Sequence, residues 1–222
     1  MSLLQFSDLL FGRQRELITA HAHGDYYEAG REGRIFTSTT TPLGLAIPLY
    51  TSVTPVGNAL WNPMGSGVYA VLIDYTAAYA SGAAASNAIG LMARNGMGSS
   101  IATAAPLSAF AETTPINGQL NGIVSTVVAA GSGAGKASRV RSSSAGTITL
   151  TTAPIASEWV RALFSANQEA SAAATGAHGT VATSYPFNGQ VWVPPGAMVW
   201  VAGTLASVAL YAQSLSWEEV PV

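Results

Sequence analysis

Short segments of strand-forming residues, each closed by a turn signal, follow one another along most of this chain. Residues 68–75, 147–151 and 197–202 are the clearest, because β-branched and aromatic side chains are frequent in them. Proline, glycine and Asn-Gly pairs lie between such segments, and these residues favour turns. The pattern predicts an all-β fold, a jelly-roll-like β-sandwich. The chain has no strict internal repeat, which argues against a β-helix or a fibre shaft.

The same signals predict local features. Residues 45–53 are a predicted strand, although Pro48 suggests an edge position or a bulge there. The pair Asn188-Gly189 predicts a hairpin turn. Residues 207–220 are a predicted long strand, in which the alternation of apolar side chains slips near Ala212 and suggests a bulge.

Charged side chains are scarce and unevenly distributed. They make up 9% of the 222 residues, whereas an average soluble domain has about 25%. Nine of them precede Ile35, namely Asp8, Arg13, Arg15, Glu16, Asp25, Glu28, Arg31, Glu32 and Arg34. The remainder of the chain is rich in Ser, Thr, Gly and Ala, and such a surface suits contact with protein neighbours. We therefore expect a subunit of an assembly.

The charge distribution sets off the N-terminal segment. Residues 1–34 are predicted to form a docking arm, extended or helical, and residues 35–222 the β-sandwich domain. Within the arm, residues 24–34 contain three glycines and alternating charges, which predicts an exposed loop or extended link.

The apolar residues of the arm recur at roughly helical spacing, but so short a segment cannot bury both of its faces by itself. We therefore expect the arm to dock on a neighbouring subunit, while a short helix that caps its own domain is the alternative. The predicted docking residues are Leu3, Phe6, Leu9, Leu10, Phe11, Arg13 and Arg15.

Composition argues against several classes of partner. The only lysine is Lys136 and the net charge is −2, so no basic cluster suggests binding to nucleic acid. The chain has no cysteine, which excludes disulfides and cysteine-based zinc sites. No uninterrupted apolar run is long enough for a transmembrane helix, and the N-terminus does not resemble a signal peptide.

The residues offer little for catalysis. The stretch before Lys136 lacks the spacing of a phosphate-binding loop and has Ala137 where a Ser or Thr is needed. His21 and His23 supply two possible metal ligands, fewer than a usual site requires. Glu218 and Glu219 would point to opposite faces of a strand. We expect a non-enzymatic protein with no catalytic, metal or cofactor-binding residues and no cofactor.

Two segments far apart in the chain carry a resemblance to a set of tailed-bacteriophage virion proteins. The first runs from Leu60 to Gly67 and is followed by an apolar strand; the second combines Val-Pro-Pro-Gly with a closing Trp-Glu-Glu. The residues concerned are Leu60, Trp61, Asn62, Pro63, Gly65, Gly67, Pro194, Pro195, Gly196, Trp217, Glu218 and Glu219. The resemblance implies a jelly-roll-like β-sandwich and a homo-oligomer, often a trimer. It implies no catalytic residues.

The expected function is that of a capsid cement or decoration protein, located in the virion on the head surface. Such a protein would bridge subunits of the major capsid protein and stabilise the shell. The alternative is a tail, collar or fibre component with a receptor- or glycan-binding role. In either case the partners are other copies of the chain and virion proteins, with neither nucleic acid nor a membrane involved.

Overall fold

The computed structural model describes most of the domain and the last part of the predicted arm. The described residues are 26–55, 57–82, 87–98, 107–118, 137–144, 148–166, 182–205 and 209–222, and for residues 165 and 166 the backbone alone. The predicted docking residues of the arm, from Leu3 to Arg15, lie outside these ranges, as do His21 and His23.

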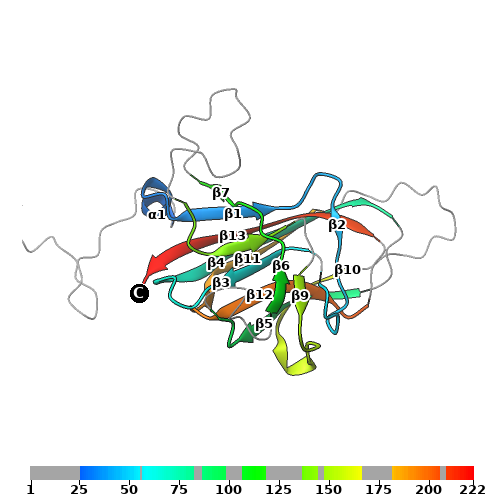
Figure 1. Cartoon of the computed structure of the whole chain (residues 1–222). Helices are drawn as coiled ribbons and strands as arrows, with labels where there is room; N and C mark the ends of the chain where they lie inside the picture. Colours follow the sequence, from blue (N-terminus) through cyan, green and yellow to red (C-terminus); the bar gives the residue numbers. More distant parts are fainter. Residues whose placement is uncertain are drawn as a thin grey trace, which may run out of the picture.

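The fold is an all-β sandwich, as the sequence predicts, and all its strand pairs are antiparallel (Figure 1). The first sheet has the order β11 (Ala182–Val193), β4 (Val68–Ser81), β13 (Leu210–Pro221), β1 (Ile35–Thr39) and β7 (Ile116–Asn117), and β2 (Leu45–Ala46) also pairs with β13. The second sheet has the order β10 (Trp159–Ala166), β5 (Asn87–Asn95), β12 (Ala197–Gly203), β3 (Ala59–Asn62) and β8 (Arg141–Ser143). A small sheet consists of β6 (Leu107–Phe110) and β9 (Ile148–Leu150).

The eight main strands pair in nested order. Strand β1 pairs with β13, β3 with β12, β4 with β11, and β5 with β10. Early strands therefore lie beside late ones, and the two halves of the chain run together along the sandwich. This order brings the turn between β3 and β4 close to the turn between β11 and β12.

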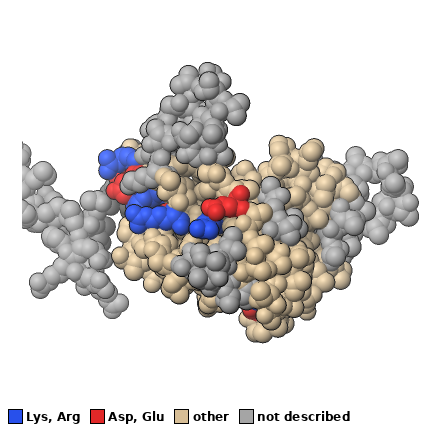
Figure 2. Space-filling model, viewed as in Figure 1, with Lys and Arg blue, Asp and Glu red and all other residues tan. Residues whose placement is uncertain are grey.

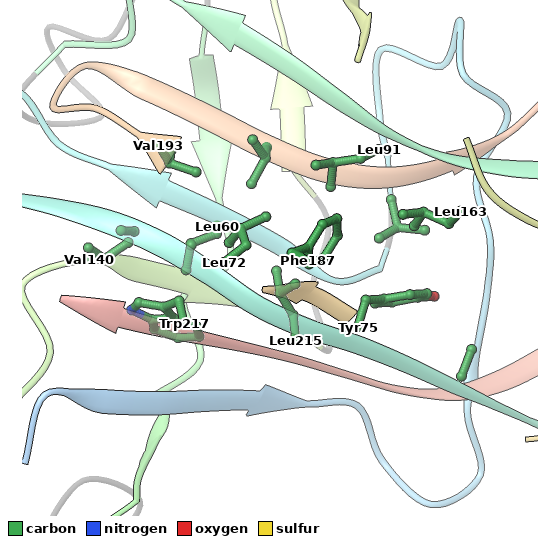
Figure 3. Packing of buried hydrophobic residues seen from close by; sticks show 14 of the residues in the cluster. Leu60, Leu72, Tyr75, Leu91, Val140, Leu163, Phe187, Val193, Leu215 and Trp217 are labelled. Atoms are coloured by element: carbon green, nitrogen blue, oxygen red, sulfur yellow. The ribbon is translucent and has the colours of Figure 1, made fainter. Parts of the chain in front are cut away.

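The main core lies between the two sheets (Figure 3). Leu72, Tyr75 and Leu215 reach it from the first sheet, and Leu60 and Leu91 from the second. All five side chains are buried. At roughly 25 cal/mol per Å² of apolar surface, burial of this kind is the main source of stability for such a fold.

A second core covers the outer face of the second sheet. Trp61, Met92, Met198 and Trp200 point away from the first sheet and are buried beneath the small sheet. Every residue of β3 and β12 is consequently buried, which gives a continuous apolar pattern rather than an alternating one.

The outer face of the first sheet has small polar side chains instead. Thr37 Oγ1 donates to Ser216 Oγ at 3.2 Å, and the hydroxyls of Thr76 and Ser214 lie 2.5 Å apart. These four residues are half-buried, and each lies directly opposite its partner on the neighbouring strand. We call this surface the hydroxyl face.

The prediction of an exposed loop over residues 24–34 is wrong for residues 27–31, while residues 24 and 25 lie outside the described ranges. Residues Tyr27–Arg31 form the helix α1, in which Glu28 and Arg31 make an ion pair at i and i+3. Ala29 is buried. A small apolar residue among charged ones therefore docks the segment.

The Asn188-Gly189 pair does not form the predicted hairpin. Both residues have positive φ, 49° and 72°, as the sequence signal requires. They lie inside β11, where the register passes from Pro186 opposite Asp74 to Val191 opposite Leu72. Five steps along β11 match two along β4, so the pair forms a large bulge.

Two other strands differ in detail from their prediction. Within residues 45–53 only Leu45–Ala46 form a strand, and the carbonyl of Pro48 instead accepts from the N–H of Gly203 at 2.8 Å. In β13 the pairing with β4 shifts register between Leu210 and Tyr211, next to the bulge predicted near Ala212, and a polar residue, Gln213, takes a buried position. No helix among the described residues has the length and apolarity needed to cross a membrane.

Candidate functional site at the motif end of the sandwich

The two motif segments, residues 60–67 and 193–219, are far apart in sequence but meet at one end of the sandwich. Asn62, the last residue of β3, is fully buried and donates from Nδ2 to the carbonyls of Val68 and Val193, both at 2.8 Å. Its own carbonyl accepts from the N–H of Gly196 at 2.8 Å. One asparagine therefore joins the turn after β3 to the turn after β11.

The C-terminal motif reaches the same place. Pro221 at the end of β13 lies opposite Val68, and the N–H of Val222 donates to the carbonyl of Gly67 at 3.1 Å. We call this region, made of residues 26–34, 62–68, 137–141, 193–197 and 217–222, the motif end.

Glycine is required at the tip of the second turn. Gly196 has a φ of +83°, which disfavours other residues. A Cβ there would lie 2.7 Å from Cε of Met64, a residue of the first turn. The exposed Met64 side chain can move away, so it is the positive φ that favours glycine at this position.

Charged side chains gather at the motif end (Figure 2). Arg34, just before β1, pairs with Glu218 of β13 and, at 2.7 Å, with Glu32. The backbone carbonyl of Arg34 also accepts from the N–H of Glu219 at 2.8 Å. The segment after α1 is thus attached to the last strand by both side-chain and backbone contacts.

Glu218 and Glu219 point to opposite faces of β13. Glu218 is half-buried, whereas Glu219 is buried, and its Oε1 accepts from Oγ of Ser138 at 2.6 Å and from the N–H groups of Arg139 and Val140 at 2.9 and 3.2 Å. A carboxylate that accepts several N–H and O–H bonds is well compensated for its burial. Glu219 therefore anchors residues 138–140 on the sheet.

A pocket of about 200 Å³ lies beside this anchor. Its lining includes the guanidinium-bearing side chains of Arg34 and Arg139, the carboxylate of Glu219, and the apolar Phe36 and Val68. The side chain of Arg139 makes no ion pair with any described residue. This arrangement can hold an acidic group of a partner by ion pairing, or a neutral polar group by hydrogen bonding.

Sequence reasoning missed an ion pair near the same end. Arg94 of β5 binds Glu158 with two hydrogen bonds, 2.6 and 2.8 Å long, and donates further bonds to the carbonyls of Thr152 and Ala153. The side chains are 9% and 17% exposed. Glu158 ends the short helix η2 (Ala156–Glu158). Since 64 positions separate the partners, no local pattern could reveal the pair.

The effects on Glu158 oppose each other. Burial acts to raise the pKa of this carboxyl, but the hydrogen bonds from Arg94 and the N–H of Ile155, with the charge of Arg94, hold the pKa below its ordinary value. The carboxylate is therefore the stable form, and the pair fixes residues 151–158 on the outer face of the second sheet.

Metal binding has no candidate within the described residues, where no three His, Cys, Asp or Glu side chains gather. His21, His23 and His178, as well as Lys136, lie outside those ranges. Comparison with protein-family models, with curated proteins and with solved structures finds no match to this chain.

Proposed function

We propose that this chain is a structural protein of a bacteriophage particle, a capsid cement or decoration protein rather than an enzyme. It would form a homo-oligomer, a trimer in the simplest case, and bridge major capsid protein subunits on the head surface. The nested strand order supports a jelly-roll topology, a fold used by viral capsid and lectin domains. The resemblance at residues 60–67 and 193–219 is the reason for choosing a phage particle.

The observation that most supports an assembly role is the half of the sandwich without charges. Beyond Asp74 and Arg161, toward the end opposite the motif end, the described residues include no Asp, Glu, Lys or Arg. These residues are 39–55, 75–82, 87–93, 162–166, 201–205 and 209–216. On the face seen in Figure 2 the charged atoms lie toward the end that carries α1 and in the middle of the molecule. A polar but uncharged surface costs less to desolvate than a charged one, which favours burial against neighbours.

The N-terminal segment would contribute a separate contact. Residues 1–25 join the fold at Tyr26, at the motif end, away from the uncharged half. Fully extended, 25 residues can span about 80 Å, enough to reach a neighbouring capsid subunit. The arm would therefore bind the particle while the uncharged half binds other copies.

Deletion of residues 1–25 tests the arm. Cutting there, rather than at residue 34, keeps the contacts of Arg34 with Glu218 and Glu219. We expect the truncated protein to fold with unchanged thermal stability and to be lost from particles assembled in a complementation assay. Normal incorporation of the truncated protein would contradict a docking role for the arm.

Copy number in purified particles tests the proposed location. Quantitative mass spectrometry against the major capsid protein should give a ratio near one, or a simple lattice fraction of it. A ratio of a few per hundred would instead assign the protein to the tail, the collar or a vertex.

A further inference from the structure

The first sheet exposes one large aromatic side chain. Trp192 on the edge strand β11 is 56% exposed, while Trp61, Trp200 and Trp217 are buried and Trp159 is half-buried. More than half of the Trp192 side chain is therefore open to contact with a partner.

The structure holds this indole in place. Nε1 of Trp192 donates to the carbonyl of Gly189 at 2.7 Å. The ring of Tyr69 packs against it, with centroids 5.6 Å apart and planes at 60°. A backbone carbonyl and an aromatic ring thus hold the indole, and its orientation is set before any partner binds.

The bulge in β11 makes the hydrogen bond possible. The positive φ values of Asn188 and Gly189 turn the chain so that the carbonyl of Gly189 faces the indole three residues later. A Cβ on Gly189 would lie within 3.5 Å of Cγ1 of Val71. Bulges that re-aim a side chain are frequent beside binding sites.

Hydrogen-bonding side chains lie on the strand that carries the ring and next to Gly189. Asn188 and Gln190 are exposed on the same strand, and Oε1 of Gln190 accepts from Arg161 at 3.0 Å. The phenol of Tyr26 lies near Gly189, 3.9 Å from where its Cβ would be. An aromatic face with an exposed amide, Asn188, on its own strand and a phenol, Tyr26, beside Gly189 suits the alternating C–H and O–H surfaces of a pyranose ring.

The size of the patch distinguishes a sugar from a protein partner. A Trp or Tyr side chain has about 150–250 Å² of surface, so the two half-exposed rings offer a few hundred Å² at most. A stable protein interface needs about 800 Å² on each side. We propose that Trp192 and Tyr69 form a stacking site for a neutral saccharide.

The test is a ligand-observed NMR titration of the full-length protein with maltohexaose, cellohexaose and chitohexaose. We expect saturable binding of at least one of these probes. Trp192→Ala should weaken that binding about tenfold or more, whereas Trp192→Tyr, which keeps a flat ring, should weaken it less. Ile155→Ala, which removes another exposed apolar side chain, is the matched control and should leave affinity unchanged.

Three results would overturn the proposal. They are an absence of binding by all three probes, equal binding by wild type and Trp192→Ala, and a lower oligomeric mass of Trp192→Ala in light scattering. The last result would make the patch a subunit contact. None of these outcomes changes the expected copy number in particles, so the site can fail while the proposed structural role stands.

Discussion

The two sheets of the sandwich present opposite kinds of outer face. The second sheet has Trp61, Met92, Met198 and Trp200 there, and β6 and β9 bury them completely. On the first sheet the corresponding surface is the hydroxyl face, which no described layer covers along the rows of Thr37 and Thr76. The large apolar side chains on the outer face of the second sheet are thus buried by another part of the same chain, the small sheet of β6 and β9.

This difference indicates which face remains for neighbours. A hydroxyl face can stay in water as a monomer and can also pack closely in an assembly, because small side chains allow backbones to approach. We expect substitutions on the second sheet to affect folding and substitutions on the hydroxyl face to affect assembly.

The largest effect is expected for Trp200→Ala. Removal of this buried ring leaves a cavity beneath the small sheet and should lower the free energy of unfolding by about 3–5 kcal/mol. Ser214→Ala, on the hydroxyl face, removes one hydroxyl and should cost about 1 kcal/mol or less. Urea denaturation of both variants measures the difference, and equal losses would contradict the contrast between the faces.

A smaller effect is expected where the segment before β10 is held to the second sheet. Arg94→Met leaves Glu158 partly buried without its partner and should cost about 2 kcal/mol. The matched control is Arg31→Met, whose pair with Glu28 is 64% and 58% exposed and should contribute close to nothing. A negligible loss for Arg94→Met would show that the segment is held by packing alone.

The same pair predicts a dependence of stability on pH. Because the folded state lowers the pKa of Glu158 below its ordinary 4.5, the contribution is complete above that value. It is lost as the pH falls through the lower pKa of the folded protein. Glu158→Gln should therefore flatten the fall in melting temperature on acidification, and an unchanged profile would assign that fall to other carboxyls.

The sequence predicted the fold class well because its signals are local. Period-two alternation in β13 and the turn residues around Pro63 and Pro194 depend on near neighbours alone. The same signals failed at Asn188-Gly189, where the required dihedrals were correct but long-range pairing with β4 placed them in a bulge. The residue types of a turn determine its backbone dihedrals, but they do not determine which strands pair on either side of it.

The candidate site was predictable only in part. The motif residues could be named from sequence, but their meeting at one end depends on nested pairing, in which Asn62 bonds Val193 across 131 positions. The exposed Trp192 lies between Val191 and Val193, so three apolar residues follow one another and the local sequence does not show which of them is exposed. The pair Arg94–Glu158 likewise arises only when β5 and η2 come together.

The central claim is that copies of the chain associate through the uncharged half of the sandwich. Light scattering after size-exclusion chromatography measures this directly, comparing wild type with Thr39→Glu, an exposed position in the row that includes Ser214 and Thr76. We predict a stable oligomer, a trimer in the simplest case, for the wild type and a folded species of lower mass for Thr39→Glu. A wild-type monomer at all concentrations, or an oligomer unchanged by Thr39→Glu, would contradict the claim.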